Sequence, residues 1–254
     1  MTDQSRLRVL ITGASSGIGA ALARRFHAGG HELVLTARRG DRLAALAAEL
    51  GGAAVVVADL ADPGAPERLL AAAGRVDVLV NNAGFGAGGW FAELDLAAQL
   101  RMLQVNVTAL TELTHRALGP MRRRGAGRVL NVASTVAFQP CPGMAVYAAS
   151  KAYVMAFSEA LWSELEGSGV TVTCLCPGAT ETEFAAVAGM GGARPFRHAM
   201  PAEAVARAGY DAAMAGRRLV VAGAANRAMT LAAGLAPRGL VLRVARRLLA
   251  PAAR

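Results

Sequence analysis

Short apolar runs alternate with longer helical patterns along this chain, and this rhythm limits the possible folds more than any other feature. The apolar runs are continuous, which is typical of strands that are buried on both faces of a parallel sheet. Strands are predicted at Arg8–Thr12, Glu32–Ala37, Ala53–Ala58, Val76–Val80, Gly127–Ala133, Val170–Leu175 and Leu219–Ala222. Helices are predicted at Gly17–Ala28, Asp41–Leu50, Pro66–Ala73, Leu96–Arg123, Val146–Glu166 and Pro201–Ala215. This alternation predicts right-handed crossovers and an α/β fold, a doubly wound parallel sheet of seven strands with helices on both faces.

The rhythm contains no repeat and no low-complexity linker. Residues 1–224 are therefore predicted to form one domain, and residues 225–254 a C-terminal extension of that domain. The hydrophobic content of 54% excludes an intrinsically disordered chain. Asp62, which precedes Pro63 and Pro66, is expected to cap the third helix.

The number of cysteines and the lack of long apolar segments indicate the cellular compartment in which the protein is expected. The chain has three cysteines, too few to crosslink a protein of this size, and Cys174 and Cys176 are expected to share one face of a strand as small core residues. Arginines interrupt every apolar stretch before the roughly 18–20 residues that a membrane span needs. The first residues lack the pattern of a signal peptide. A cytoplasmic protein in a reducing compartment is expected.

Positive charge is concentrated in the C-terminal part. The chain has 27 basic and 18 acidic residues, a net charge of +9, and residues 184–254 carry this whole excess. Leu240–Leu249 is predicted to be a basic amphipathic helix. Three interpretations remain open: docking on its own or a partner subunit, peripheral contact with an anionic membrane, and nucleic-acid binding. Because no aromatic residue or motif accompanies the charge, no nucleic-acid partner is expected. Arg122–Arg124 is interpreted as charge that complements a helix dipole.

A glycine-rich turn joins the first predicted strand to the first predicted helix. Gly13 permits the tight turn, Gly17 lets the backbone approach a pyrophosphate, and Gly19 allows the helix to pack closely on the strand. The start of the helix offers free N–H groups and the positive end of its dipole to phosphates. A dinucleotide cofactor is therefore expected at this turn. Its predicted contacts are Gly13, Ser15, Ser16, Gly17, Ile18 and Gly19.

The end of the second strand indicates which dinucleotide binds. An acidic residue at this place would bind a ribose 2′-hydroxyl, but the chain has Arg38 followed by Arg39. Guanidinium groups suit a 2′-phosphate, so the predicted cofactor is NADP(H). The alternative is that Arg38 is only surface charge.

Two further strand ends carry polar residues at the edge where open α/β sheets bind ligands. Asp59, followed by Leu60, is expected either to accept a hydrogen bond from adenine or to cap a helix. Asn82, Ala83 and Gly84 follow the fourth strand, and asparagine there can tie loops together or contact the ribose.

Tyr147 and Lys151 are four residues apart, so they lie on one face of a predicted helix. An adjacent ammonium would stabilise a phenolate and lower the tyrosine pKa toward neutrality. Among 27 basic residues Lys151 is the single lysine, and a compact ammonium can reach a ribose hydroxyl and the phenol together. The pair is therefore interpreted as a proton donor and its partner.

Two more polar residues are candidates for the same site. Ser134 follows the fifth strand and is expected to bind a carbonyl oxygen to which Tyr147 donates a proton. Asn106 lies in an apolar helical stretch, where a polar side chain needs partners. It is either a satisfied structural asparagine or the anchor of a water that feeds protons toward Lys151.

Taken together, these motifs resemble the short-chain dehydrogenase/reductase family, in its single-domain type, over about residues 7–183. The matching positions are residues 12–19, residues 81–84, Asn106, Ser134, Tyr147, Lys151, Pro177, Gly178 and Thr182. The resemblance implies a Rossmann-like fold, with Asn106, Ser134, Tyr147 and Lys151 as the catalytic residues and no metal. It also implies that Pro177, Gly178, Thr180 and Thr182 contact the nicotinamide half of the cofactor. Homodimers or homotetramers are expected, formed through the helices that hold Asn106 and Tyr147.

The implied reaction is hydride transfer between the nicotinamide and a carbonyl or hydroxyl group. Apolar residues in three loops favour an apolar ketone as the small-molecule substrate: Phe85, Trp90, Phe138, Met144, Phe184 and Phe196. The alternative function is a catalytically idle NADP(H)-binding regulator or redox sensor. An epimerase or dehydratase is disfavoured, because the chain lacks a large substrate domain.

Overall fold

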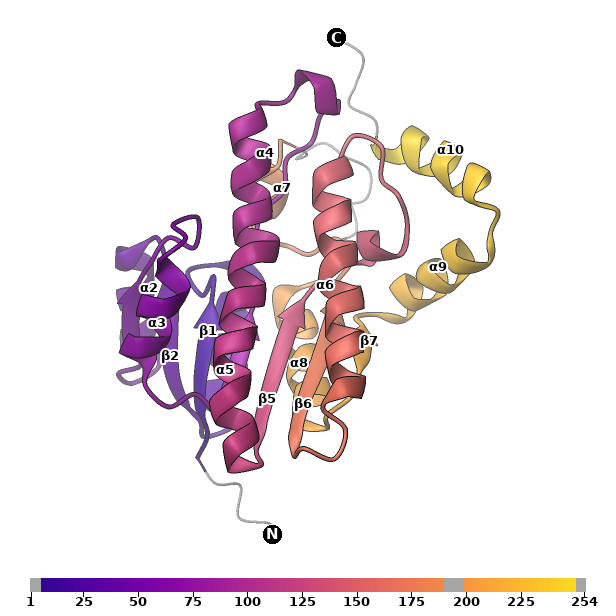
Figure 1. Ribbon diagram of the computed structural model, residues 1–254. Helices are drawn as coiled ribbons and strands as arrows, with labels where there is room; N and C mark the ends of the chain where they lie inside the picture. The colour runs from indigo at the N-terminus through magenta and orange to yellow at the C-terminus, as the bar shows by residue number, and fades with distance from the viewer. Residues whose placement is uncertain (1–5, 190–198, 250–254) are drawn as a thin grey trace.

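The computed structural model describes residues 6–189 and 199–249 of the chain. Seven parallel strands form one sheet in the order β3-β2-β1-β4-β5-β6-β7 (Figure 1). The strands are β1 (Arg8–Thr12), β2 (Glu32–Ala37), β3 (Ala54–Val57), β4 (Val78–Asn81), β5 (Gly127–Val132), β6 (Val170–Cys176) and β7 (Leu219–Val221). The order reverses between β1 and β4, so this sheet confirms the predicted doubly wound, Rossmann-like topology.

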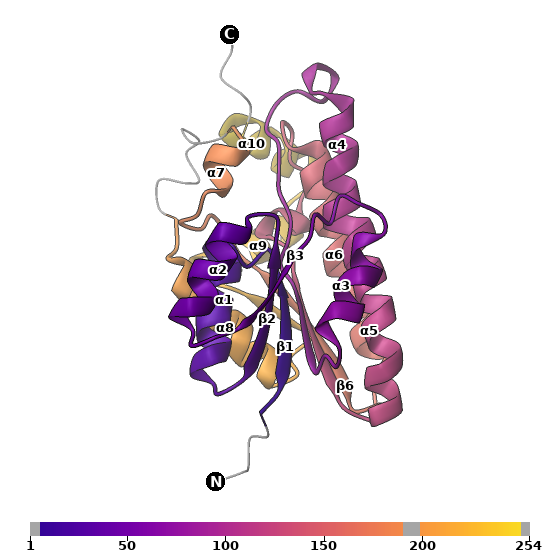
Figure 2. The same ribbon diagram turned by 90° about the vertical axis from the view of Figure 1, so that its left-hand side faces the viewer.

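Helices cover both faces of the sheet (Figure 2). One face packs on α1 (Gly17–Ala28), α2 (Gly40–Glu49) and α8 (Ala202–Met214), and the other on α3 (Ala65–Ala73), α5 (Leu110–Arg124) and α6 (Ala145–Glu164). Strand residues alternate between these two layers. Val9 and Ile11 belong to the core beneath α1, whereas Leu10 lies in the core beneath α5. Because both layers are apolar, the strands read as continuous apolar runs.

Two local features differ from the sequence-based expectation. The edge strand β3 leaves Val55 and Val57 exposed, so the prediction of burial on both faces is wrong for this strand. The N-cap of α3 is Gly64, and Asp62 instead closes the preceding turn by accepting a hydrogen bond from the Gly64 N–H at 3.0 Å. The other predicted helix and strand ends lie within two residues of the observed ones.

The predicted helix Leu96–Arg123 consists of three consecutive helical segments. α4 (Leu96–Leu103) leads into a π-helical turn at Gln104–Ala109, and α5 follows without a break. Arg122, Arg123 and Arg124 occupy the last turn of α5 before the left-handed Gly125, which confirms their interpretation as charge at a helix C-terminus.

Two C-terminal helices, α9 (Ala224–Leu235) and α10 (Arg238–Leu249), project from the sheet beyond β7 (Figure 1). α10 includes the predicted amphipathic segment, whereas α9 and the short α7 (Phe184–Val187) are absent from the prediction. Val241 and Ala245 of α10 are buried against the body, while Arg243, Arg246 and Arg247 are exposed. In the described part of the chain, no helix is both long and apolar enough to span a membrane.

Candidate active site

A cleft of about 1040 Å³ lies at the carboxyl ends of the strands, where the strand order reverses. All the residues predicted to bind the cofactor line this cleft, as do Ser134, Tyr147 and Lys151. Asn106 lies just behind the lining residues. The sheet topology thus brings together side chains that are up to about 170 residues apart in the chain.

The glycine turn has the backbone geometry that its sequence predicts. Gly13 and Gly17 have positive φ angles of 67° and 54°. A Cβ atom on Gly19 would lie 2.2 Å from the Gly13 carbonyl oxygen, so only glycine fits there. Ser16, the N-cap of α1, makes no side-chain capping bond, and the first turn has no acidic residue. The start of α1 therefore presents N–H groups to an anion in the cleft.

Asn82 holds the glycine turn in place. Its Nδ2 donates to the carbonyl oxygens of Thr12, at 2.9 Å, and Gly13, at 3.2 Å. The Thr12 hydroxyl oxygen in turn accepts from the N–H groups of Asn82 and Ala83, each at 3.0 Å. These bonds support the interpretation that Asn82 ties two loops together.

The two arginines after β2 differ in their contacts. Arg39 donates from Nη2 to the hydroxyls of Ser15, at 3.1 Å, and Ser16, at 2.7 Å, and its Nη1 lies 2.8 Å from a carboxylate oxygen of Glu183. Arg38 is exposed and forms no ion pair with any described residue. The sequence predicts Arg38 as the main 2′-phosphate ligand, whereas the arginine in contact with the glycine turn is Arg39.

Asp59 caps no helix. Its Oδ1 accepts from the Ala61 N–H at 3.0 Å, and its Oδ2 lies 3.5 Å from Arg101. The helix-cap alternative is therefore wrong, and the carboxylate forms a local turn at the wall of the cleft.

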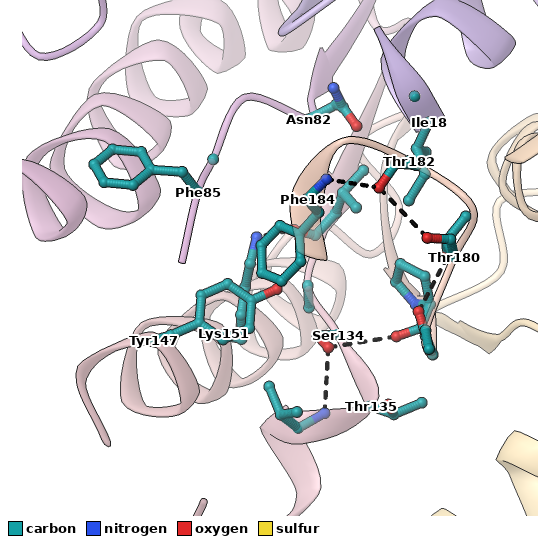
Figure 3. Close-up of a pocket in the computed structure, with 18 of the residues that line it drawn as sticks. Ile18, Asn82, Phe85, Ser134, Thr135, Tyr147, Lys151, Thr180, Thr182 and Phe184 are labelled. Carbon is teal, nitrogen blue, oxygen red and sulfur yellow. Dashed lines mark hydrogen bonds between the residues drawn. The ribbon is translucent and has the colours of Figure 1, made fainter. Parts of the chain in front are cut away.

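Tyr147, Lys151 and Ser134 meet in the middle of the cleft (Figure 3). Tyr147 and Lys151 come from one face of α6, and the Lys151 Nζ lies 5.8 Å from the centre of the tyrosine ring. This ammonium donates to the Val132 carbonyl oxygen at 2.8 Å. Ser134, which follows β5, accepts from the Val136 N–H at 3.3 Å.

Burial determines the protonation states of Tyr147 and Lys151. It raises the pKa of the Tyr147 phenol well above 10, and a hydrogen bond with Ser134 offsets only part of that rise. Burial also lowers the pKa of Lys151 to about 8. The expected lowering of the tyrosine pKa is not seen in this arrangement, because desolvation of the phenol outweighs the hydrogen bond with Ser134.

The Asn106 side chain is bonded at both of its polar atoms. Its Oδ1 accepts from the Phe85 N–H at 3.1 Å, and its Nδ2 donates to the Phe85 carbonyl at 3.0 Å and to Ser150 Oγ at 3.1 Å. These bonds fit the interpretation of a satisfied structural asparagine, and the role of Asn106 as the anchor of a water stays a prediction. It sits in the π-helical turn and holds the loop after β4 beside Lys151.

The loop after β6 forms the wall beside the glycine turn, where a Cβ atom on Gly17 would lie 2.8 Å from the Thr182 methyl group. Thr182 Oγ1 accepts from the Phe184 N–H at 3.2 Å and donates to the Thr180 carbonyl at 3.4 Å (Figure 3). The Phe184 ring packs on Tyr147, with ring centres 5.2 Å apart. Phe196, which was predicted to line the same wall, lies outside the described residues.

Sequence reasoning missed part of the lining. Glu183 from this loop, Met229 from α9, and Leu240 and Val244 from α10 also face the cleft. The amphipathic pattern of α10 signalled a docking face, but not that the face points into the cleft. Among residues 6–189 and 199–249, no group of three His, Cys, Asp or Glu side chains is arranged to hold a metal ion.

The chain is similar to known proteins in sequence and in fold. A family model described as short chain dehydrogenase matches residues 8–190. Serine 3-dehydrogenase from Agrobacterium fabrum is 44% identical over 185 residues, covering 70% of this chain and 74% of that protein. A short-chain dehydrogenase from Sphingobium yanoikuyae, solved with NADPH, is 35% identical with a TM-score of 0.81, covering 89% of this chain and 92% of that one. A 7β-hydroxysteroid dehydrogenase is 25% identical with a TM-score of 0.84, covering 94% and 96%.

Proposed function

The chain belongs to the short-chain dehydrogenase family, and from this premise we propose that it is an NADPH-dependent oxidoreductase that reduces an apolar ketone. The observation that carries the proposal is the convergence of Tyr147, Ser134 and Lys151 in one cleft with the glycine turn and its arginines. NADP(H) is the cofactor present in a solved relative, and it supplies the hydride when bound.

The residues of the cleft fit this cofactor. The uncapped start of α1 and the glycine turn are suited to the pyrophosphate, because a side chain at Gly19 would fill the space. Arg38 and Arg39 are the cations available to a 2′-phosphate. Lys151 would hold the nicotinamide ribose, and Thr180 and Thr182, which also line the cleft, would contact the nicotinamide half of the cofactor.

Tyr147 is the proton donor in reduction. Its phenol keeps its proton at neutral pH because burial raises its pKa. It donates that proton to the carbonyl oxygen, and Ser134 holds the same oxygen by a hydrogen bond. Lys151, with a pKa of about 8, is mostly charged at neutral pH and stabilises the phenolate that remains. Asn106 positions the loop that packs beside Lys151.

The walls of the cleft favour a large apolar substrate. Met229, Leu240 and Val244 are 47–48% exposed, yet they line the cleft across from the Phe184 wall. Apolar side chains that face a cleft in this way are suited to an apolar ligand. A ketone large enough to reach from Tyr147 to α10 would cover them.

A panel of ketones and alcohols, followed by NADPH absorbance, tests this function. Large apolar ketones should be reduced with NADPH faster than with NADH, and faster than polar hydroxy acids such as serine are oxidised with NADP+. Equal or better turnover with NADH would contradict the cofactor assignment. Tight NADPH binding without turnover across the panel would instead favour the catalytically idle regulator.

We also propose that the protein is a homodimer or homotetramer. The helices α4 and α6 expose large apolar side chains: Leu96, Leu100, Tyr153 and Trp162. A second copy would bury them. Light scattering after size-exclusion chromatography tests this, and a monomer at micromolar concentration would contradict it. The exposed arginines of α10 also support a proposed peripheral contact with anionic lipid.

A further inference from the structure

Glu183 forms an ion-pair cluster at the edge of the cofactor cleft. One carboxylate oxygen lies 2.8 Å from Nη1 of Arg39, and the other lies 2.5 Å from Nη1 of Arg42. These two arginines lower the pKa of Glu183 to about 2, so its side chain is a carboxylate at any working pH. The cluster joins the loop after β6 to the loop after β2, although the residues are more than 140 positions apart.

Arg39 is shared between this carboxylate and the glycine turn. Its Nε and Nη2 atoms donate to Ser15, and Nη2 also donates to Ser16, so Nη1 is the part of the fork that faces Glu183. Arg39, Ser15 and Glu183 all line the cleft. An anion that approaches Arg39 from the cleft therefore meets a guanidinium that already has a carboxylate partner.

We propose that Glu183 is a specificity-determining residue, whose carboxylate occupies the arginine donors that the 2′-phosphate of NADPH requires. The inference rests on the proposed NADP(H) dependence. A phosphate monoester carries close to two negative charges at neutral pH and can displace a single carboxylate from Arg39. A ribose 2′-hydroxyl has no charge with which to compete, so NADH leaves the ion pairs in place. Glu183 thus reduces the affinity for NADPH and leaves the affinity for NADH unchanged.

Displacement of the Glu183 carboxylate by the 2′-phosphate also affects the loop after β6, which forms the wall of the cleft beside Tyr147. Glu183 lies between Thr182, whose methyl group would be 2.8 Å from a Cβ on Gly17, and Phe184, which packs on Tyr147. When the carboxylate leaves Arg39, one of the two ion pairs that join this wall to the segment after β2 is lost. Binding of the 2′-phosphate at one end of the cleft therefore loosens the attachment of the loop that packs beside Tyr147.

Glu183→Gln tests the proposal, with Glu181→Gln as the matched control. Glu181 is two residues earlier in the same loop, is exposed, and pairs with no cation among the described residues. Both variants remove one negative charge. Isothermal titration of the full chain with NADPH and with NADH, without substrate, measures affinity independently of turnover. Loss of one exposed ion pair corresponds to about 1.4- to 5-fold in affinity.

Because the parent must give up the Arg39 ion pair to bind the phosphate, Glu183→Gln should bind NADPH about 1.4- to 5-fold more tightly than the parent and bind NADH equally well. Glu181→Gln should change neither affinity by that much. Weaker NADPH binding by Glu183→Gln would overturn the proposal, because the carboxylate would then be positioning Arg39 for the phosphate. An equal gain for NADH, or an equal gain in Glu181→Gln, would overturn it as well. If the parent binds neither dinucleotide, the proposed function itself fails.

Discussion

At the scale of single residues, desolvation decides how the reacting group ionises. Tyr147 is buried among Met102, Cys141 and Met144, so its phenol is held in the neutral form. Lys151 is buried as well, and its ammonium already donates to a backbone carbonyl. The pair is therefore arranged to release a proton and then stabilise the negative charge that follows, which suits reduction.

Tyr147→Phe removes the proton donor and leaves the ring packing intact. Turnover with NADPH should fall by about 100-fold or more, since positioned acid–base catalysis contributes 10²–10⁴. The dissociation constant for NADPH should stay nearly unchanged. Tyr153→Phe, on the same helix with its hydroxyl 3.0 Å from Thr111, is the matched control and should keep full turnover. Retained turnover in Tyr147→Phe would exclude the tyrosine as the donor.

Lys151 lowers the stability of the fold. Its pKa is about 8 in the folded protein, below the ordinary 10.5, so at neutral pH the folded state holds a charge that burial disfavours. This cost is full below pH 8 and disappears as pH rises toward 10.5, where the unfolded chain also loses its proton. Lys151→Met should therefore raise the free energy of unfolding by about 1–3 kcal/mol at pH 7 and by less at pH 9.5.

Urea unfolding of the parent and Lys151→Met at both pH values measures this difference. The variant should also lose turnover, because the phenolate loses its partner. A Lys151→Met protein that is less stable than the parent at pH 7 would show that the bond to Val132 outweighs the desolvation of the ammonium.

The sequence predicted which residues surround the cleft better than it predicted their contacts. Tyr147, Lys151 and Ser134 lie where strand order and helix spacing require, because topology alone brings those strand ends together. The choice between Arg38 and Arg39 depends on side-chain torsions and on Glu183, a residue 144 positions from Arg39. The sign of the tyrosine pKa shift depends on how many apolar groups pack around the ring. Neither can be derived from residue spacing.

At the scale of elements, helices with a clear apolar period and strands with continuous apolar runs were predictable. The π-helical turn at Gln104–Ala109 was not, because such turns are rare insertions within α-helices and no residue type in this segment marks one. α9 was missed for another reason. Its buried residue is Thr230, and its small side chains give no helical period. α10 was predicted because Val241 and Ala245, four residues apart, share a buried face.

Helix α1 packs so closely on the glycine turn that a side chain at Gly19 should destabilise the fold. A methyl group at Gly19 would collide with the Gly13 carbonyl and with Asn82 Nδ2, at 2.2 and 2.5 Å. Gly19→Ala should therefore lower the free energy of unfolding by about 1–3 kcal/mol and weaken NADPH binding. Gly234→Ala in α9 is the control, since nothing lies within 4 Å of its Cβ position. It should be neutral or stabilise by up to about 1 kcal/mol. Equal urea midpoints for the two variants would contradict the packing argument.

At the scale of the whole molecule, the charge is split between a neutral body and a basic C-terminal part. Residues 1–183 have a net charge of zero, and residues 184–254 carry eleven arginines and two acidic residues. α10 uses its apolar face to dock on its own subunit, with Arg246 stacked over Trp90 at 5.7 Å. The apolar centre of the helix is therefore occupied, and lipid would meet mainly its exposed arginines. Such contact would be electrostatic and reversed by salt.

Arg243→Gln together with Arg247→Gln tests that contact, with Arg122→Gln and Arg123→Gln at the end of α5 as a control pair of equal charge. All four arginines are exposed. Each basic residue near an anionic surface contributes about 1 kcal/mol, so the α10 pair should reduce binding to phosphatidylserine vesicles by about 10-fold or more at low salt. The α5 pair should sediment with vesicles like the parent. Vesicle binding that survives in the α10 variant, or that resists 0.5 M salt, would show that arginine charge on α10 does not direct the protein to lipid.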